Sequence, residues 1–145
     1  MSRVLTLERI NEIVKRHRPR GWRVAQSKRR WDWSSASANW EKRTLYVPTL
    51  KDDDSLFLYL HEVGNIVRRH FHLDLPAHRE EFEAEHFAVH VFRTEGIPVT
   101  KLIVSDARAR LCSHIEADIK KGVPIQRHIA RWANHKGKCR GRKRR

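Results

Sequence analysis

The spacing of apolar residues predicts a mixed α and β fold. A first amphipathic helix is expected between Thr6, which can cap it, and Pro19, with apolar residues at helical spacing: Leu7, Ile10, Ile13 and Val14. In residues 21–26 apolar and polar positions alternate, and residues 43–47 form a second strand-like run closed by a proline. These two predicted strands could form a small antiparallel sheet, with room for a third strand within residues 31–40.

The most apolar stretch of the chain follows a helix-start signal. Residues 52–55, three aspartates and a serine, place capping oxygens and negative charge at an N-terminus. Five apolar residues then follow without interruption, as in a buried helix: Leu56, Phe57, Leu58, Tyr59 and Leu60. This helix is predicted to reach about residue 71, and three further helices are predicted over residues 77–94, 100–122 and 124–132.

These elements predict an α+β fold in which a small antiparallel sheet packs on a helical core. Residues 1–135 are expected to form one domain, since a chain of 145 residues is long enough for one hydrophobic core. Residues 136–145 contain almost no apolar side chain, so they are expected to form a disordered basic tail.

The net charge of +14 is unevenly distributed along the chain. Residues 1–50 carry 12 basic and 4 acidic residues (+8), residues 51–100 carry 5 and 10 (−5), and residues 101–145 carry 14 and 3 (+11). Basic flanks of this kind attract nucleic acid, but a solvated surface without a ligand fits them equally well. If nucleic acid binds, contacts are expected from six basic residues: Arg29, Arg30, Lys138, Arg140, Arg142 and Lys143.

Neither the apolar runs nor the cysteines indicate a membrane or secreted protein. No apolar run approaches the about 20 residues of a membrane-spanning helix, and the N-terminal segment lacks the apolar core of a signal peptide. Cys112 lies in a predicted helix and Cys139 in the polar tail, which is typical of free thiols. We therefore expect a cytoplasmic protein without a membrane partner.

The residues with the clearest chemistry lie in the predicted buried helix. His61 and Glu62 begin the sequence His-Glu-Val-Gly-Asn. In the metallopeptidase pattern His-Glu-x-x-His, two histidines four residues apart bind one zinc ion, and the glutamate polarises the zinc-bound water. Asn65 occupies the position of the second histidine, and an amide oxygen is a weak zinc ligand. Alone, this motif is more often a structural His-Glu pair than a metal site.

The next predicted helix offers a further ligand. Glu83 begins the sequence Glu-Ala-Glu-His-Phe-Ala, and a carboxylate from an adjacent antiparallel helix would complete a site of two histidines and one glutamate. His86 lies one turn beyond Glu83 and is an alternative ligand. The acidic residues could instead form a solvated surface, although their apolar neighbours favour burial of at least one carboxylate. Three nearby histidines are expected at the surface: His70, His72 and His78.

Together, residues 60–65 and 83–88 resemble the ImmA/IrrE-type zinc metallopeptidases, which combine a His-Glu-x-Gly-His helix with a Glu-Ala-x-x-Phe-Ala helix. The likeness covers roughly residues 43–132 and is greatest to small phage and bacterial members. It implies a zincin-like fold, zinc held by His61 and Glu83, Glu62 as general base, and a peptide or protein substrate. If residues 43–47 lie at a sheet edge beside the cleft, they could bind that substrate by strand addition.

Asn65 departs from the family pattern at the second zinc ligand. A natural pseudoenzyme, a residue introduced to disarm the site, or a substitute ligand such as His86 would each account for it. We expect weak Zn²⁺ binding and impaired peptidase activity. The alternative function is a nucleic-acid-binding pseudoenzyme or regulatory protein that uses the basic flanks.

Overall fold

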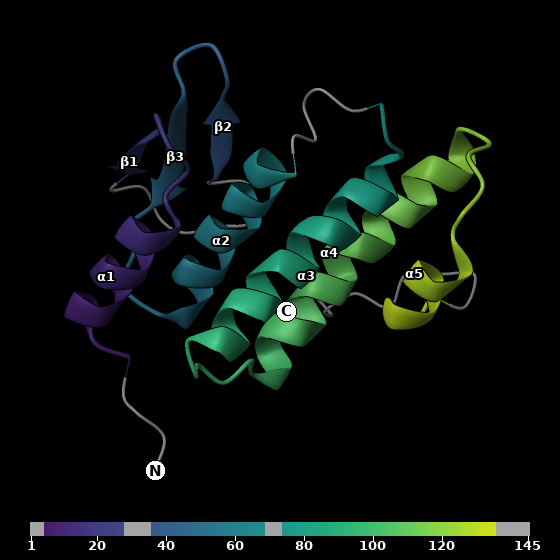
Figure 1. Ribbon diagram of the computed structural model, residues 1–145. Coiled ribbons are helices and arrows are strands. Elements are labelled where there is room, and N and C mark those ends of the chain that lie inside the picture. The colour runs from purple at the N-terminus through teal and green to yellow at the C-terminus, as the bar shows by residue number, and fades with distance from the viewer. Residues whose placement is uncertain (1–4, 28–35, 69–73, 136–145) are drawn as a thin grey trace.

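The computed structural model describes residues 5–27, 36–68 and 74–135. Within these ranges the chain forms five helices and a three-stranded mixed sheet packed against helices (Figure 1). The elements follow one another in the order α1 (Leu7–His17), β1 (Arg23–Ser27), β2 (Ser37–Asn39), β3 (Thr44–Pro48), α2 (Asp53–Val67), α3 (Ala77–Thr94), α4 (Lys101–Lys120) and α5 (Arg127–Trp132). The predicted α+β class is confirmed.

Side-chain caps fix where three of the helices begin. The hydroxyl of Thr6 accepts a hydrogen bond from the amide of Arg9, and the hydroxyl of Thr100 accepts one from the amide of Ile103. At the start of α2, Asp52 and Ser55 form a reciprocal capping box. Such caps satisfy amide groups that the first turn of a helix leaves without partners, which is why the sequence located these starts correctly.

The sheet differs from the predicted antiparallel pair. Its strand order is β1–β3–β2, with β1 parallel to β3 and β2 antiparallel to β3. β2 lies within residues 31–40, where a third strand was expected to be possible. After β2 the chain turns back to form β3. The backbone of Arg43 adopts a positive φ of 45° in the turn between them. β3 therefore occupies the centre of the sheet, so the condition for strand addition at residues 43–47, a place at the sheet edge, is not met.

α2 forms the centre of the hydrophobic core. Figure 1 shows it between the sheet and α1 on one side and α3 on the other. Five of its apolar side chains are at most 1 % exposed: Leu56, Phe57, Tyr59, Leu60 and Val63. A Cβ atom at Gly64 would lie 3.0 Å from the Cβ of Phe87 and 3.2 Å from the Cα of Ala84. The absence of a side chain there lets α2 and α3 approach closely, one turn away from His61.

His78 is fully buried near the start of α3, and the expectation that it lies at the surface is wrong. Its Nδ1 lies 2.6 Å from Oδ2 of Asp118 on α4, and its backbone amide donates to the same oxygen at 2.9 Å. The pair anchors the start of α3 to the end of α4, because a buried imidazole requires a polar partner. His70 and His72 lie outside the described residues.

Candidate metal centre

His61 lies between two carboxylates of α3. Its Nε2 is 3.3 Å from Oε2 of Glu81, and its Nδ1 is 3.2 Å from Oε1 of Glu85. His61 is 5 % exposed and Glu85 is fully buried. Glu81 and Glu85 are four residues apart, so they project from the same face of α3 toward α2. Each of the three residues offers one potential ligand atom, and these three atoms lie within 4.8 Å of one another.

α4 contributes two more polar side chains, which sequence reasoning missed. Nη2 of Arg110 lies 2.7 Å from Oε1 of Glu85, and Nε donates to the same oxygen at 3.0 Å. Nε2 of His114 lies 3.5 Å from Oε2 of Glu81. Arg110 and His114 are also four residues apart, so an acidic stripe on α3 faces a basic stripe on α4. The i, i+4 spacing of Arg110 and His114 was the feature of the sequence that could have identified them as one stripe of a helix.

The charges in this cluster are strongly coupled. Burial opposes the charged form of His61, but Glu81 and Glu85 outweigh it and raise the pKa of His61 well above its ordinary value. Burial likewise opposes ionisation of Glu81, yet the neighbouring cations His61, His114 and Arg110 lower its pKa to about 2. The cluster without a metal is therefore stabilised by a charged imidazole beside the ionised carboxylate of Glu81.

The residues of the cluster fit a zinc ion. Among the described residues, Nδ1 of His61 and Oε2 of Glu85 have no hydrogen-bond partner, although both atoms are buried. Both atoms lie on the Glu85 side of the imidazole, so the fit rests on the other side, where Nε2 of His61 and Oε2 of Glu81 lie 3.3 Å apart. Imidazole nitrogen and carboxylate oxygen are common zinc ligands. The set holds one strong imidazole ligand fewer than a site of two histidines and one glutamate.

Glu83 does not belong to this cluster, and its choice as the third ligand is corrected by the structure. Its Oε1 lies 3.4 Å from Nε of Arg79, one turn earlier on α3. Residue 83 lies two positions from both 81 and 85, and two positions correspond to about 200° around a helix. Glu81 and Glu85 therefore face His61, while Glu83 projects from the other side of α3.

The alternative ligand His86 also lies elsewhere. It is exposed, its Nδ1 lies 3.1 Å from the carbonyl oxygen of Phe82, and its ring lies 3.9 Å from the ring of Phe82. Asn65 stays near the predicted site, where it forms a hydrogen bond with Glu62. Burial raises the pKa of Glu62, against the opposing effects of His61 and of this hydrogen bond.

A cleft of about 720 Å³ opens beside the cluster. Its lining comes from α2, α3, α4, the β2 strand with the turn that follows it, and Tyr46 of β3. The lining includes Glu62, Asn65, Glu81, His114, Asn39 and Trp40. Among the described strands, β2 pairs with β3 and lies at the edge of the sheet. Three residues of β2 line the cleft together with Tyr46 of β3, so β2 is the edge strand next to it.

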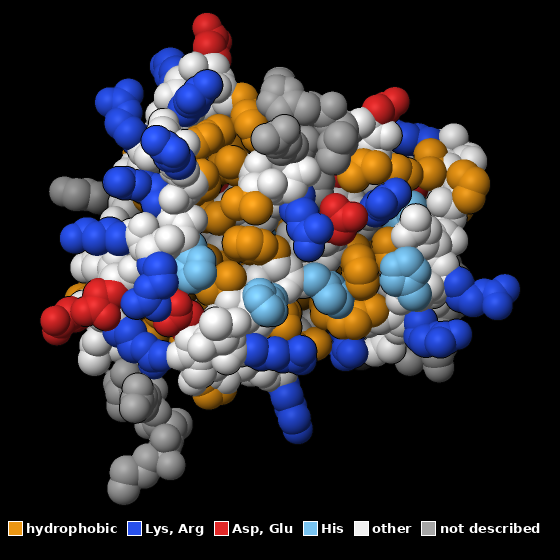
Figure 2. All heavy atoms as spheres, in the orientation of Figure 1, with side chains coloured by type: hydrophobic (Ala, Val, Ile, Leu, Met, Phe, Trp, Pro, Cys, Tyr) orange, Lys and Arg blue, Asp and Glu red, His pale blue; other side chains and the backbone are white. Residues whose placement is uncertain are grey.

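The proposed nucleic-acid contacts lie outside the described residues, because Arg29 and Arg30 fall within 28–35 and the tail residues within 136–145. In the part that is described, Figure 2 shows Lys and Arg side chains gathered along the edge formed by α1 and the sheet. Histidine side chains are spaced across the same face toward α5. None of the described helices is both long and apolar enough to span a bilayer.

Comparison of the chain with protein-family models, with curated proteins and with solved structures gave no significant match. Function must therefore be inferred from the chemistry of the site.

Proposed function

We propose that this chain is a zinc-metallopeptidase-like protein with an impaired metal centre. One observation carries the proposal: Glu62 and Asn65 of α2 and Glu81 of α3 line the same cleft, next to the β2 strand. A His-Glu pair on a buried helix, a carboxylate on the adjacent helix and a strand edge beside them are the parts of a zincin-like site. The resemblance to ImmA/IrrE-type sequences supports the same conclusion.

The proposed ligands are Nε2 of His61 and the carboxylate of Glu81, with the amide of Asn65 as a weak third group. Glu85 acts as a positioning residue, since its carboxylate contacts Nδ1, the ring nitrogen on the other side of His61. Carboxylates in this position commonly orient zinc-bound histidines. The guanidinium of Arg110 neutralises Glu85 at 2.7 Å. Of the two α3 carboxylates that contact His61, Glu81 is therefore the one that lines the cleft.

Glu62 is the proposed general base. A bound Zn²⁺ would supply Lewis acidity toward a peptide carbonyl and acidify a water molecule. Burial raises the pKa of the Glu62 carboxyl, which moves it toward neutral pH and makes the carboxylate a better proton acceptor. The hydrogen bond from Asn65 holds this carboxylate beside the cleft and limits the rise of its pKa.

The β2 strand is the proposed docking edge for an extended peptide. An extended segment can add to a free strand edge through backbone hydrogen bonds, with alternate side chains entering the adjacent cleft. Ser37, Ala38 and Asn39 of β2 line that cleft together with the candidate base Glu62. A peptide docked along β2 would pass the catalytic side of α2.

Zinc titration of the full chain tests the proposal through a pair of histidine variants. His114→Ala should weaken Zn²⁺ binding by about tenfold, because His114 contacts the same Glu81 oxygen as His61. His86→Ala should leave the affinity unchanged, since His86 packs against Phe82. His61→Ala should abolish binding at this site. Isothermal titration of chelator-treated protein gives the affinities, and equal losses from His86→Ala and His114→Ala would contradict the ligand assignment.

Nucleic-acid binding is a second candidate function, favoured by the charge distribution. The last ten residues contain seven Lys or Arg, and residues 101–145 carry a net charge of +11. Phosphate contacts release counterions, so the affinity for duplex DNA should fall at least about tenfold between 50 and 200 mM salt. A chain ending at residue 135 should bind more weakly with a shallower salt dependence. Fluorescence anisotropy measures both, and no detectable binding at low salt would reject the candidate.

A further inference from the structure

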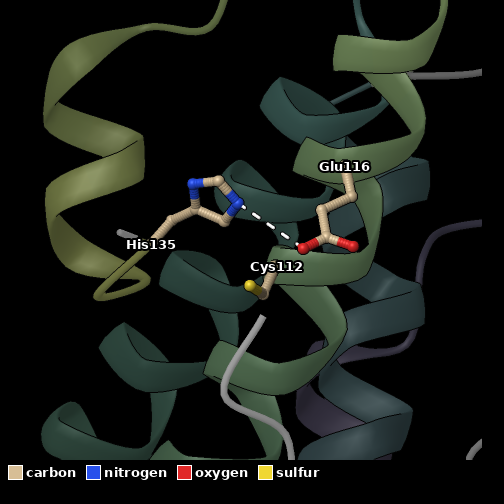
Figure 3. A group of neighbouring side chains, drawn as sticks. All are labelled: Cys112, Glu116 and His135. Atoms are coloured by element: carbon tan, nitrogen blue, oxygen red, sulfur yellow. Dashed lines mark ion pairs between the residues drawn. The ribbon is translucent and has the colours of Figure 1, made fainter. Parts of the chain in front are cut away.

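A second group of metal-ligating side chains lies on the side of α4 away from the His61 cluster. Cys112 and Glu116 project from successive turns of α4, two residues beyond Arg110 and His114, which corresponds to about 200° around the helix. His135 follows α5 and reaches the same place (Figure 3). One atom from each of these three residues lies within 4.8 Å of the others.

The packing of α5 on α4 explains why His135 arrives there. A small apolar cluster joins the two helices through Leu111, Ile115, Ile129 and Ala133. Nε of Arg108 donates to the carbonyl oxygen of Trp132 at 2.9 Å, which fixes the end of α5. The chain then turns at Asn134, where φ is +55°, and the amide of His135 donates to the carbonyl oxygen of Ala130. The backbone at the end of α5 therefore places His135 beside α4.

The imidazole of His135 is buried, with one ring nitrogen unsatisfied in the described part of the chain. Nε2 of His135 is buried and has no hydrogen-bond partner among the described residues. The side chain of His135 is 7 % exposed, and Nε2 lies 3.7 Å from Oε1 of Glu116, too far for a hydrogen bond. Figure 3 shows the sulfur of Cys112 directed toward the same space. Cys112 is a free cysteine and 2 % exposed.

We propose that Cys112, Glu116 and His135 bind a Zn²⁺ ion that fastens α5 to α4. Thiolate sulfur, carboxylate oxygen and imidazole nitrogen are all zinc ligands, and the sulfur selects against Mg²⁺ and Ca²⁺. The three residues fill three of the four tetrahedral positions and leave the fourth to water. On binding, the thiol proton of Cys112 passes to solvent as the zinc–sulfur bond forms. This site shares no residue with the proposed peptidase centre.

Cobalt substitution gives a spectroscopic test that the His61 cluster cannot mimic. Co²⁺ bound to a thiolate produces a near-ultraviolet charge-transfer band, which carboxylate and imidazole ligands alone do not give. In the full chain carrying Cys139→Ser, Cys112 is the remaining thiol. This chain should show the band on addition of Co²⁺, and Zn²⁺ should abolish it by displacement. The band should persist after His61→Ala, which removes the other site, and disappear after Cys112→Ala.

A nearby variant keeps the test decisive if Cys112→Ala fails to fold. His135 follows the last helix, so His135→Gln should leave the circular dichroism spectrum unchanged while lowering Co²⁺ and Zn²⁺ affinity at least about tenfold. His128→Gln, the same change at an exposed histidine of α5, is the matched control and should keep the affinity. Absence of the thiolate band in the folded Cys139→Ser chain would overturn the proposal. Unchanged affinity in His135→Gln would also overturn it.

Discussion

Replacement of Glu85 by Gln should lower the free energy of unfolding by about 3–5 kcal/mol, whereas Glu83→Gln should change it by less than about 0.5 kcal/mol. Glu85 is fully buried between His61 and Arg110, with Nη2 of Arg110 at 2.7 Å. The amide keeps the shape of the side chain but removes its negative charge. The buried His61 and the partly buried Arg110 would then share the carboxylate of Glu81, and uncompensated charge in the interior is strongly destabilising.

The comparison between the two glutamates also tests which face of α3 points inward. Urea unfolding at neutral pH with a chelator present measures both variants without a contribution from bound metal. The dependence of unfolding free energy on urea should stay constant, because neither variant changes the surface exposed on unfolding. Equal losses for the two variants, or a larger loss for Glu83→Gln, would contradict the placement of Glu85 in the interior.

Asn65→His should raise the Zn²⁺ affinity of the peptidase-like site by more than about 100-fold. Loss of an outer-shell partner alone changes zinc affinity by about 10- to 100-fold, and a second imidazole ligand contributes more than such a partner. Asn65 already lines the cleft beside Glu62 and Glu81, so an imidazole at this position enters the right surroundings. At a free zinc concentration of about 100 times the dissociation constant, binding should stabilise the fold by about 2.7 kcal/mol.

Matched variants separate ligand geometry from simple addition of a histidine. Val67→His places an imidazole two residues further along α2, at an exposed position, and should not raise the affinity. Asn65→His should also gain peptide hydrolysis, which Glu62→Gln in the same chain should remove without loss of zinc. Tightly held, stoichiometric zinc at the His61 site of the unaltered chain would refute the view that Asn65 impairs this site.

Local signals in the sequence determined most of the secondary structure. The capping residues Thr6, Asp52 and Thr100 located three helix starts, because a cap acts within one turn of its own helix. The uninterrupted apolar run before His61 indicated a helix buried on all sides, and residues 56–60 are at most 2 % exposed. These features depend on neighbours in the chain, which the sequence shows directly.

The sequence also identified the two helices that form the candidate site, but not which side chains of α3 face His61. It selected α2 for His61, Glu62 and Asn65, and α3 for a facing carboxylate. The motif spacing favoured Glu83, whereas the structure directs Glu81 and Glu85 toward His61. All three glutamates share a charged, partly apolar environment in the sequence. Their order along the chain does not say which stripe of α3 meets α2.

Only the tertiary structure decided the rotation of α3, the position of β3 in the sheet and the contributions of α4 to the site. The rotation depends on the close approach at Gly64, where the nearest atoms belong to Ala84 and Phe87. Arg110 and His114 reach the cluster because α4 packs along α3, which brings together residues about 30 positions apart. Contacts between residues so far apart in the chain depend on which helix faces pack together and are removed from water. A helix encodes its own periodicity, but its orientation is fixed by the side chains of the elements against which it packs.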